Sequence, residues 1–134
     1  MAATMQVELV SPEKLLASIE AEKVLLPGSD GAFTAMAGHV PVVTALSPGS
    51  IRIVNGAEEH EYLIAGGFAE VSGNSISILA EFASLRADAT PEMFQSSLEA
   101  SEKSLEGLEK DELAEATRRH GSLKTMVETL GRAA

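Results

Sequence analysis

The sequence predicts a mainly β plus α protein, with an N-terminal antiparallel β-sandwich over residues 1–88 and a C-terminal antiparallel two-helix hairpin over residues 89–134. Eight of the 11 glycines and four of the 5 prolines precede residue 89, where they separate short β-branched runs. Short strands spaced by turn residues are typical of a sandwich or barrel. Beyond residue 88, apolar residues recur at alternating spacings of 3 and 4, which indicates helices.

The composition limits the classes of function that fit the chain. The 134 residues suit one core of ordinary size, and the absence of cysteine excludes disulfides, thiol nucleophiles and cysteine-bound metals. Twenty acidic against 10 basic residues give a net charge of −10, which argues against a nucleic-acid partner and against direct lipid insertion. We find no apolar run long enough to span a bilayer and expect no secretory signal at the N-terminus.

The first elements of the chain read as strands. Met5, Val7 and Leu9 alternate with polar residues, which predicts a half-buried strand that Pro12 ends. Residues 15–26 form a second, mixed run that ends at Pro27.

Three turn signals divide the next part of the chain. The pair Asn55-Gly56 after Ile53 is best suited to a two-residue type I′ hairpin, and a returning strand follows over residues 62–65. Glycines 66 and 67 then predict a bend or bulge between strands. Residues 68–71 and 75–80 form a last strand pair joined at residues 73–74.

Two helices follow. Thr90 is placed to cap the first, with Pro91 as its first helical residue, and Asp111 is placed to cap the second after a turn in residues 107–111. Gly121 within the second helix is expected to cost about 1 kcal/mol relative to alanine. Each helix has one narrow apolar seam, formed by Phe94, Leu98, Ser101, Leu105 and Leu108 in the first and by Leu113, Ala116, His120, Leu123, Val127 and Leu130 in the second.

The search for catalytic chemistry finds little. The histidines His39, His60 and His120 show no metal-ligand spacing, and we interpret His60 and His120 as surface or seam residues. Residues 28–31 (GSDG) lack the Gly-Lys-Ser/Thr ending of a phosphate loop. These residues favour a binding or structural module over an enzyme.

Several segments resemble the epsilon subunit of F-type ATP synthases, a bacterial family homologous to the mitochondrial delta subunit. They occur in the correct order over residues 5–88: residues 7–13 (VELVSPE), 26–31 (LPGSDG), 38–41 (GHVP), 47–49 (SPG), 51–53 (IRI), 66–71 (GGFAEV) and 76–81 (ISILAE). The hairpin expected after the sandwich is also a feature of that family.

The resemblance implies a non-catalytic rotor subunit of the central stalk. In the family, the sandwich is held against the gamma subunit and rests on the c-ring, so that proton flow is coupled to ATP synthesis in the alpha/beta head. The implied location is the cytoplasmic face of a bacterial inner membrane. The c-ring-facing contact corresponds here to Asp30, Gly38, His39 and Pro41, and Ala32 stands where many relatives have an acid.

The resemblance also raises two expectations for the hairpin. In many relatives it extends along gamma and blocks ATP hydrolysis, so it contacts the alpha/beta head. The residues that would make such inhibitory contacts here are Arg118, Arg119, Lys124 and Arg132; the alternative is an ordinary solvated face. The ATP-binding pattern of some relatives, Ile/Leu-Asp-x-x-Arg-Ala, has neither its Asp nor its Arg in residues 89–94, so we expect weak or no ATP binding and no other cofactor or metal.

Two other interpretations of the sequence remain possible from the residues alone. One is a free-standing β-sandwich adaptor or ligand-binding module with a helical tail, which co-purification with gamma and the c-ring would exclude. The other is a small hydrolase that gathers His39 or His60 with acidic residues in a pocket.

Overall fold

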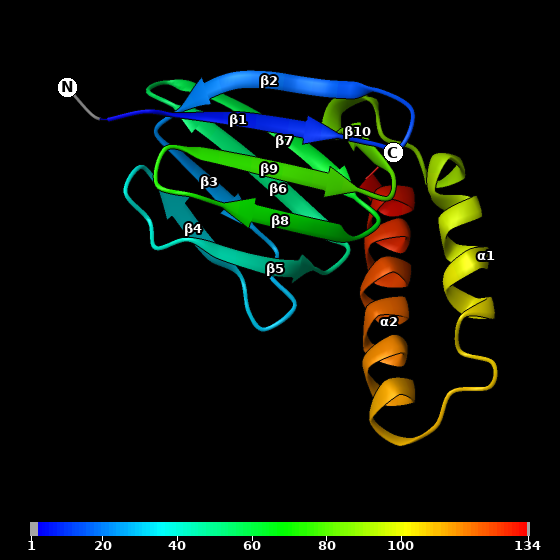
Figure 1. Cartoon of the computed structure of the whole chain (residues 1–134). Helices are drawn as coiled ribbons and strands as arrows, with labels where there is room; N and C mark the ends of the chain where they lie inside the picture. Colours follow the sequence, from blue (N-terminus) through cyan, green and yellow to red (C-terminus); the bar gives the residue numbers. More distant parts are fainter. Residues whose placement is uncertain (1–2, 134) are drawn as a thin grey trace.

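The computed structural model describes residues 3–133 and shows two five-stranded sheets packed face to face, with two helices at one end (Figure 1). The first sheet has the order β2-β1-β9-β8-β5 and the second the order β10-β7-β6-β3-β4. All pairs are antiparallel except β1 with β9, which run parallel. The β-sandwich and helical hairpin expected from the sequence are therefore confirmed.

The strands are short, and turn residues separate most of them. Gly66 and Gly67 carry the chain from the second sheet to the first, between β7 and β8. The ten strands are β1 (Met5–Val10), β2 (Leu15–Ala21), β3 (Lys23–Leu26), β4 (Phe33–Met36), β5 (Val42–Leu46), β6 (Gly49–Asn55), β7 (Glu58–Ile64), β8 (Gly67–Val71), β9 (Ser75–Ala80) and β10 (Ala83–Leu85).

The core of the sandwich follows the period-2 pattern of the sequence. In β1, β6 and β9 every second side chain is directed into the space between the sheets, as expected for two sheets that each bury one face. The fully buried members include Val7, Leu9, Ile51, Ile53, Ile76 and Ile78. The core supplies the close packing that makes the sandwich a stiff body.

One hairpin turn differs from the prediction. Asn55 pairs with Glu58, so the two loop residues are Gly56 and Ala57 rather than Asn55 and Gly56. Gly56 has a φ of 62°, and among the described residues Lys110 alone has a positive φ without being glycine. A type I′ turn needs a positive φ at both loop residues, so the type I′ prediction is wrong. A glycine at the first loop position is instead the requirement of a type II′ turn.

The helical part begins at Pro91 as predicted, but its first turn is 3₁₀ and the α-helix starts only at Gln95. Residues 86–88 and 91–94 form two short 3₁₀ turns, η1 (Arg86–Asp88) and η2 (Pro91–Phe94), before α1 (Gln95–Lys103) and α2 (Lys110–Ala133). Thr90 occupies the cap position of η2, but its hydroxyl makes no capping hydrogen bond. Asp111 lies inside the first turn of α2 and is not its cap. Its charge still suits the helix N-terminus.

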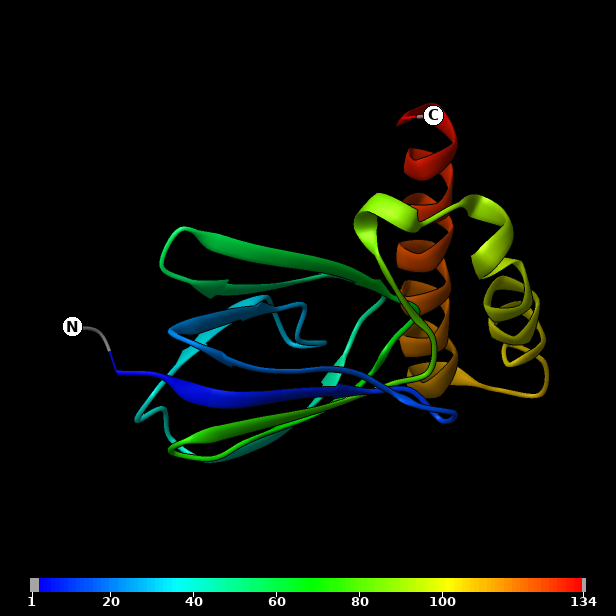
Figure 2. The same ribbon diagram turned by 90° about the horizontal axis from the view of Figure 1, so that it is seen from above.

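The hairpin docks on one end of the sandwich, where β7 ends (Figures 1 and 2). Leu63, near the end of β7, and Ala65, just after it, are buried together with Phe94 and Leu123. The rings of Phe82 and Phe94 meet edge to face, with centroids 5.0 Å apart. In both ribbon views α2 lies between the sandwich and α1 (Figures 1 and 2). Within the hairpin, the predicted seam residues His120 and Ser101 meet, with Nδ1 3.1 Å from Oγ.

Candidate interaction surfaces

Both loops singled out in the sequence lie along one edge of the sandwich, where β4 and β5 are the outermost strands of their sheets. Asp30 is exposed in the loop after β3. The Ser29 amide donates to the Ala45 carbonyl at 2.9 Å, and Gly28 forms a bridge with Leu46. The loop of Asp30 is therefore fastened to the end of β5 nearest the helices.

Gly38, His39 and Pro41 share the turn between β4 and β5, at the other end of β4 from Asp30. Gly38 has a φ of 87°, and its amide donates to the Gly73 carbonyl at 2.7 Å. The His39 amide donates to the Met36 carbonyl at 2.9 Å. The structure thus brings three of the four predicted residues together and places Asp30 apart from them.

Phe33 lies between these two loops. Its ring centroid is 6.0 Å from that of His39, and a Cβ added to Gly28 would approach its ring carbons to 3.1 Å. Nδ1 of His39 is 2.7 Å from the Val40 carbonyl oxygen, so the ring donates from that nitrogen and is held in the turn. His39 therefore has a turn-stabilising contact whatever else it binds.

Exposed aliphatic side chains lie within four residues of His39 in the chain, and the sequence analysis did not identify them. Met36 is 55% exposed, Val40 74% and Val43 70%. Several large apolar side chains exposed in one short segment are typical of a surface that a partner covers.

A second apolar surface lies on the outward face of the first sheet. Five side chains that follow one another in strand register cross all five strands, and we call them the apolar row: Ala45, Phe68, Leu79, Val10 and Leu15. Phe68 is 57% exposed, Leu79 58% and Leu15 53%. Sequence reasoning missed this row. The signal was present, because Phe68 alternates with the inward residues Ala69 and Val71 and must face outward.

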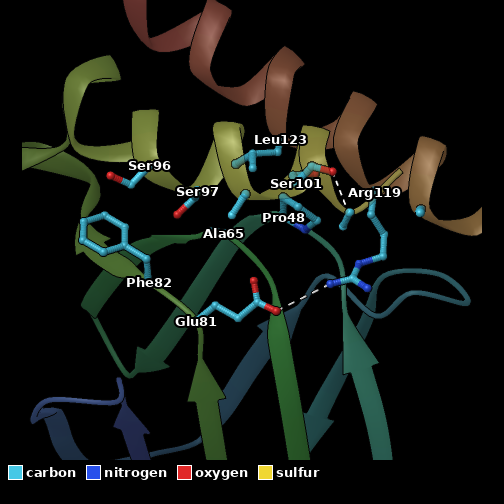
Figure 3. A pocket seen from close by; sticks show the side chains of 12 residues that line it. Pro48, Ala65, Glu81, Phe82, Ser96, Ser97, Ser101, Arg119 and Leu123 are labelled. Carbon is cyan, nitrogen blue, oxygen red and sulfur yellow. Dashed lines mark hydrogen bonds and ion pairs between the residues drawn. The ribbon is translucent and has the colours of Figure 1, made fainter. Parts of the chain in front are cut away.

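A cleft of about 620 Å³ lies between the hairpin and the end of the sandwich (Figure 3). Arg119 reaches across it from α2 and pairs with Glu81 at 3.6 Å. Serines 96, 97 and 101 of α1 also line the cleft, together with Ser104 just after that helix and Ala116 of α2. In this docked state Arg119 is engaged with the sandwich itself.

The other predicted helix cations are arranged differently. Arg118 pairs with Glu115 one turn earlier on the same helix. That hydrogen bond and charge raise the pKa of Arg118, with a further contribution from the charge of Asp30. Lys124 is exposed. The side chain of Arg132 lies outside the described side chains.

The described part of the chain assembles no cluster of side chains that could hold a metal ion. Over residues 3–133, groups of three or more histidines and carboxylates with metal-binding geometry are absent. His60 is exposed on β7, with Nε2 4.0 Å from a Glu58 oxygen. Neither of the two described helices is long and apolar enough to cross a bilayer.

One buried side chain has a shifted pKa. Burial raises the pKa of Tyr62, which faces the core.

A rigid sandwich with a docked hairpin, whose prominent exposed features are apolar surfaces on one sheet and one edge, defines a class of protein that works by binding other proteins. The family described as ATP synthase, Delta/Epsilon chain, beta-sandwich domain matches residues 4–86. The chain belongs to this family.

Relatives named "ATP synthase epsilon chain" share much of the sequence. The chain is similar to that of Rhodobacter capsulatus, with 52% identity over 90 residues that cover 67% of this chain and 68% of the relative. For Paracoccus denitrificans the identity is 42% over 85% of this chain and 78% of the relative. For Rhodopseudomonas palustris (strain BisB18) it is 37% over 92% of each.

Solved structures share the fold. A chain of the Euglena gracilis mitochondrial ATP synthase (OSCP/F1/c-ring) superposes with a TM-score of 0.64 at 19% identity, covering 95% of this chain and 83% of that one. A chain of the Tetrahymena thermophila mitochondrial ATP synthase central stalk/c-ring gives 0.62 at 17% identity, covering 98% and 97%.

Proposed function

We propose that this chain is a non-catalytic central-stalk subunit of a proton-translocating ATP synthase. It links the c-ring to the gamma subunit and so couples proton flow to ATP synthesis. It acts as a peripheral protein on the cytoplasmic face of a bacterial inner membrane. The family, the bacterial relatives named ATP synthase epsilon chain and the fold of the stalk-containing structures support this proposal.

The observation that carries the proposal is the apolar row. Its side chains stand on a rigid sheet, and three of them are more than half exposed: Phe68, Leu79 and Leu15. Full burial of one such side chain is worth about 1.5–3 kcal/mol. A row across five strands therefore favours a permanent partner with a complementary apolar surface. Gamma is the partner that fits, because a torque-carrying contact needs a stiff sheet and a broad area.

The edge formed by β4 and β5 is the surface proposed for the c-ring. It carries Asp30 at one end, and Gly38, His39 and Pro41 at the other, with exposed valines between them. An acid, an imidazole and aliphatic side chains together suit the polar loops of a membrane ring and the apolar residues beside them. Asp30 is the acid available for this contact, because position 32 is alanine.

The decisive experiment is a pull-down with tagged protein from its native membranes, with the partners identified by mass spectrometry. We expect both gamma and the c-ring subunit. Recovery of neither would favour the free-standing adaptor instead.

The coupling of ATP hydrolysis to proton pumping tests the proposed residues at the edge formed by β4 and β5. The double variant Asp30→Ala/His39→Ala is expected to reduce ATP-driven proton pumping in reconstituted membranes. Unchanged pumping would overturn the assignment of these residues. The matched control is Asp88→Ala/His60→Ala, which removes the same two side-chain types from exposed sites.

Inhibition of ATP hydrolysis is a second candidate function. It would require the docked hairpin to rearrange. In the docked state Arg119 pairs with Glu81 and Arg118 with Glu115, so contacts of these cations with the alpha/beta head need the hairpin to leave the sandwich. Truncation after Asp88 tests this. A severalfold rise in hydrolysis by the assembled complex would identify the hairpin as an inhibitor, and no change would leave it a solvated appendage.

ATP binding by the cleft is expected to be weak or absent. Its one cation, Arg119, is already paired with Glu81. Binding of phosphates would have to displace that pair. Calorimetry that finds micromolar affinity for ATP would contradict this expectation.

A further inference from the structure

The hairpin and the loop of Asp30 meet at the same turn of the sandwich, residues 47–48 between β5 and β6. Pro48 is buried and lines the cleft beneath the hairpin. On its other side the turn holds the loop, because the Ser47 amide donates to the Pro27 carbonyl at 2.8 Å. A Cβ added to Gly49 would lie 3.3 Å from that of Pro27, so the Pro27 ring packs closely against the residue that follows the turn.

The other contacts of the loop are with Leu46, through the bridge of Gly28, with the ring of Phe33, and through the hydrogen bonds of its amides. Its amides use Ala45 and its own Gly28 carbonyl, with Ser29 donating to the first at 2.9 Å and Gly31 to the second at 3.0 Å. Asp30 is exposed. The position of the loop therefore depends on the end of β5 and on the turn that follows it.

Charges on α2 reach toward the same region. Arg119 pairs with Glu81 at 3.6 Å and passes over Gly66, where an added Cβ would lie 3.8 Å from the guanidinium. Its neighbour Arg118 pairs with Glu115 on the same helix. When the hairpin is docked, α2 thus places the Arg119 guanidinium against the end of the sandwich.

We infer that docking of the hairpin and ordering of the loop over residues 27–31 are energetically linked through the turn at residues 47–48. By thermodynamic reciprocity, a partner that fixes this loop favours the docked hairpin, and an undocked hairpin loosens the loop. The identification of this partner as the c-ring rests on the proposed function. The linkage between hairpin and loop inside the chain is independent of the proposed function.

The second candidate ring-facing turn provides an internal contrast. The amides of Gly38 and His39 donate to Gly73 and Met36, at the end of the sandwich away from the hairpin. This turn has no hydrogen bond to residues 47–48 among the described contacts. One of the two loops is therefore linked to the hairpin and the other is independent of it.

Amide hydrogen exchange, followed by NMR on the isolated full-length chain, tests the linkage. Leu123→Ala removes a buried contact of the hairpin and is expected to speed exchange in α2 by roughly 30-fold or more. The Ser29 and Ser47 amides should accelerate with α2, while the Gly38 and His39 amides keep their wild-type rates. Glu81→Gln removes the partner of Arg119 and should give the same pattern at about 5-fold or less, because exposed ion pairs are weak.

The control is Glu70→Gln, which removes the same charge from an exposed site on the first sheet and should leave all these rates unchanged. If Leu123→Ala accelerates α2 but not Ser29 and Ser47, the linkage is refuted. Equal acceleration of Gly38 and His39 would also refute it, because the effect would then be a general loosening. The test uses no other subunit, so its outcome is separate from that of the pull-down.

Discussion

At the end of the sandwich nearest the helices, both sheets carry outward apolar side chains, but those side chains differ in exposure. Leu63 of the second sheet is directed outward, yet it is 3% exposed because Phe94 and Leu123 cover it. Phe68 and Leu79 of the first sheet are also directed outward, and they remain 57% and 58% exposed. The chain covers one apolar surface with its own hairpin and leaves the other free. An uncovered surface of this kind is where a partner is expected.

The largest test of this comparison replaces one phenylalanine on each side. Phe94→Ala is expected to lower the free energy of unfolding of the hairpin by about 3–5 kcal/mol, because Phe94 is fully buried against Phe82. Phe68→Ala should change stability by no more than about 0.5 kcal/mol, because the ring is already largely in water. Urea denaturation of both variants, with limited proteolysis of the hairpin, measures the difference.

The comparison fails if the two variants are equally destabilised, since Phe68 would then be supported within the chain. Phe94 lies outside the cluster of buried residues that forms the sandwich core. The sandwich of Phe94→Ala should therefore stay folded, which the exchange rates of β1 and β9 report.

The junction between the two sheets comes next in expected effect. Gly67 begins β8, and a Cβ there would lie 2.1 Å from the Leu79 carbonyl oxygen. Gly67→Ala is therefore expected to cost about 1–3 kcal/mol through forced movement of the backbone. Gly73→Ala is the matched control, because no atom lies within 4 Å of its added Cβ. Thermal unfolding of the two variants should separate them; similar melting temperatures would show that β8 and β9 yield without cost.

The third test addresses the partner of the uncovered surface. Leu79→Asp places a charge in the middle of the apolar row and should weaken binding of purified gamma at least tenfold, since about 1.5–3 kcal/mol of burial is lost. Val54→Asp on the outward face of the second sheet is the control, and its binding should be unchanged. Equal binding by Leu79→Asp and the unaltered chain would remove gamma from this face.

The sequence predicts those parts of the molecule that local patterns decide. The alternation of Met5, Val7 and Leu9 was enough to place β1, and the helical seams were enough to predict a hairpin. It could not show that Leu63 and Phe68, five residues apart in the chain, would meet such different surroundings. That difference depends on where a helix more than 20 residues later packs, which no local pattern encodes. The type of the Gly56 turn was likewise decided by the pairing register, which the dipeptide alone does not specify.

The smallest effect concerns Tyr62, the inward neighbour of Leu63 and the one tyrosine of the chain. Burial raises its pKa above the ordinary value of 10.0, so the folded protein keeps the phenol proton where the unfolded chain loses it. The unfolded state then binds fewer protons, and stability is expected to fall as the pH rises above about 10 while staying unaffected below it. Urea denaturation between pH 8 and 11.5 measures this, and Tyr62→Phe should lack that component of the decline.

Because the chain has a single tyrosine, absorbance near 295 nm follows the same ionisation directly. Ionisation of the folded protein at or below pH 10 would show that solvent reaches the phenol despite the packing around it. The comparison would then be sharper still, with the outward Leu63 better protected than its inward neighbour.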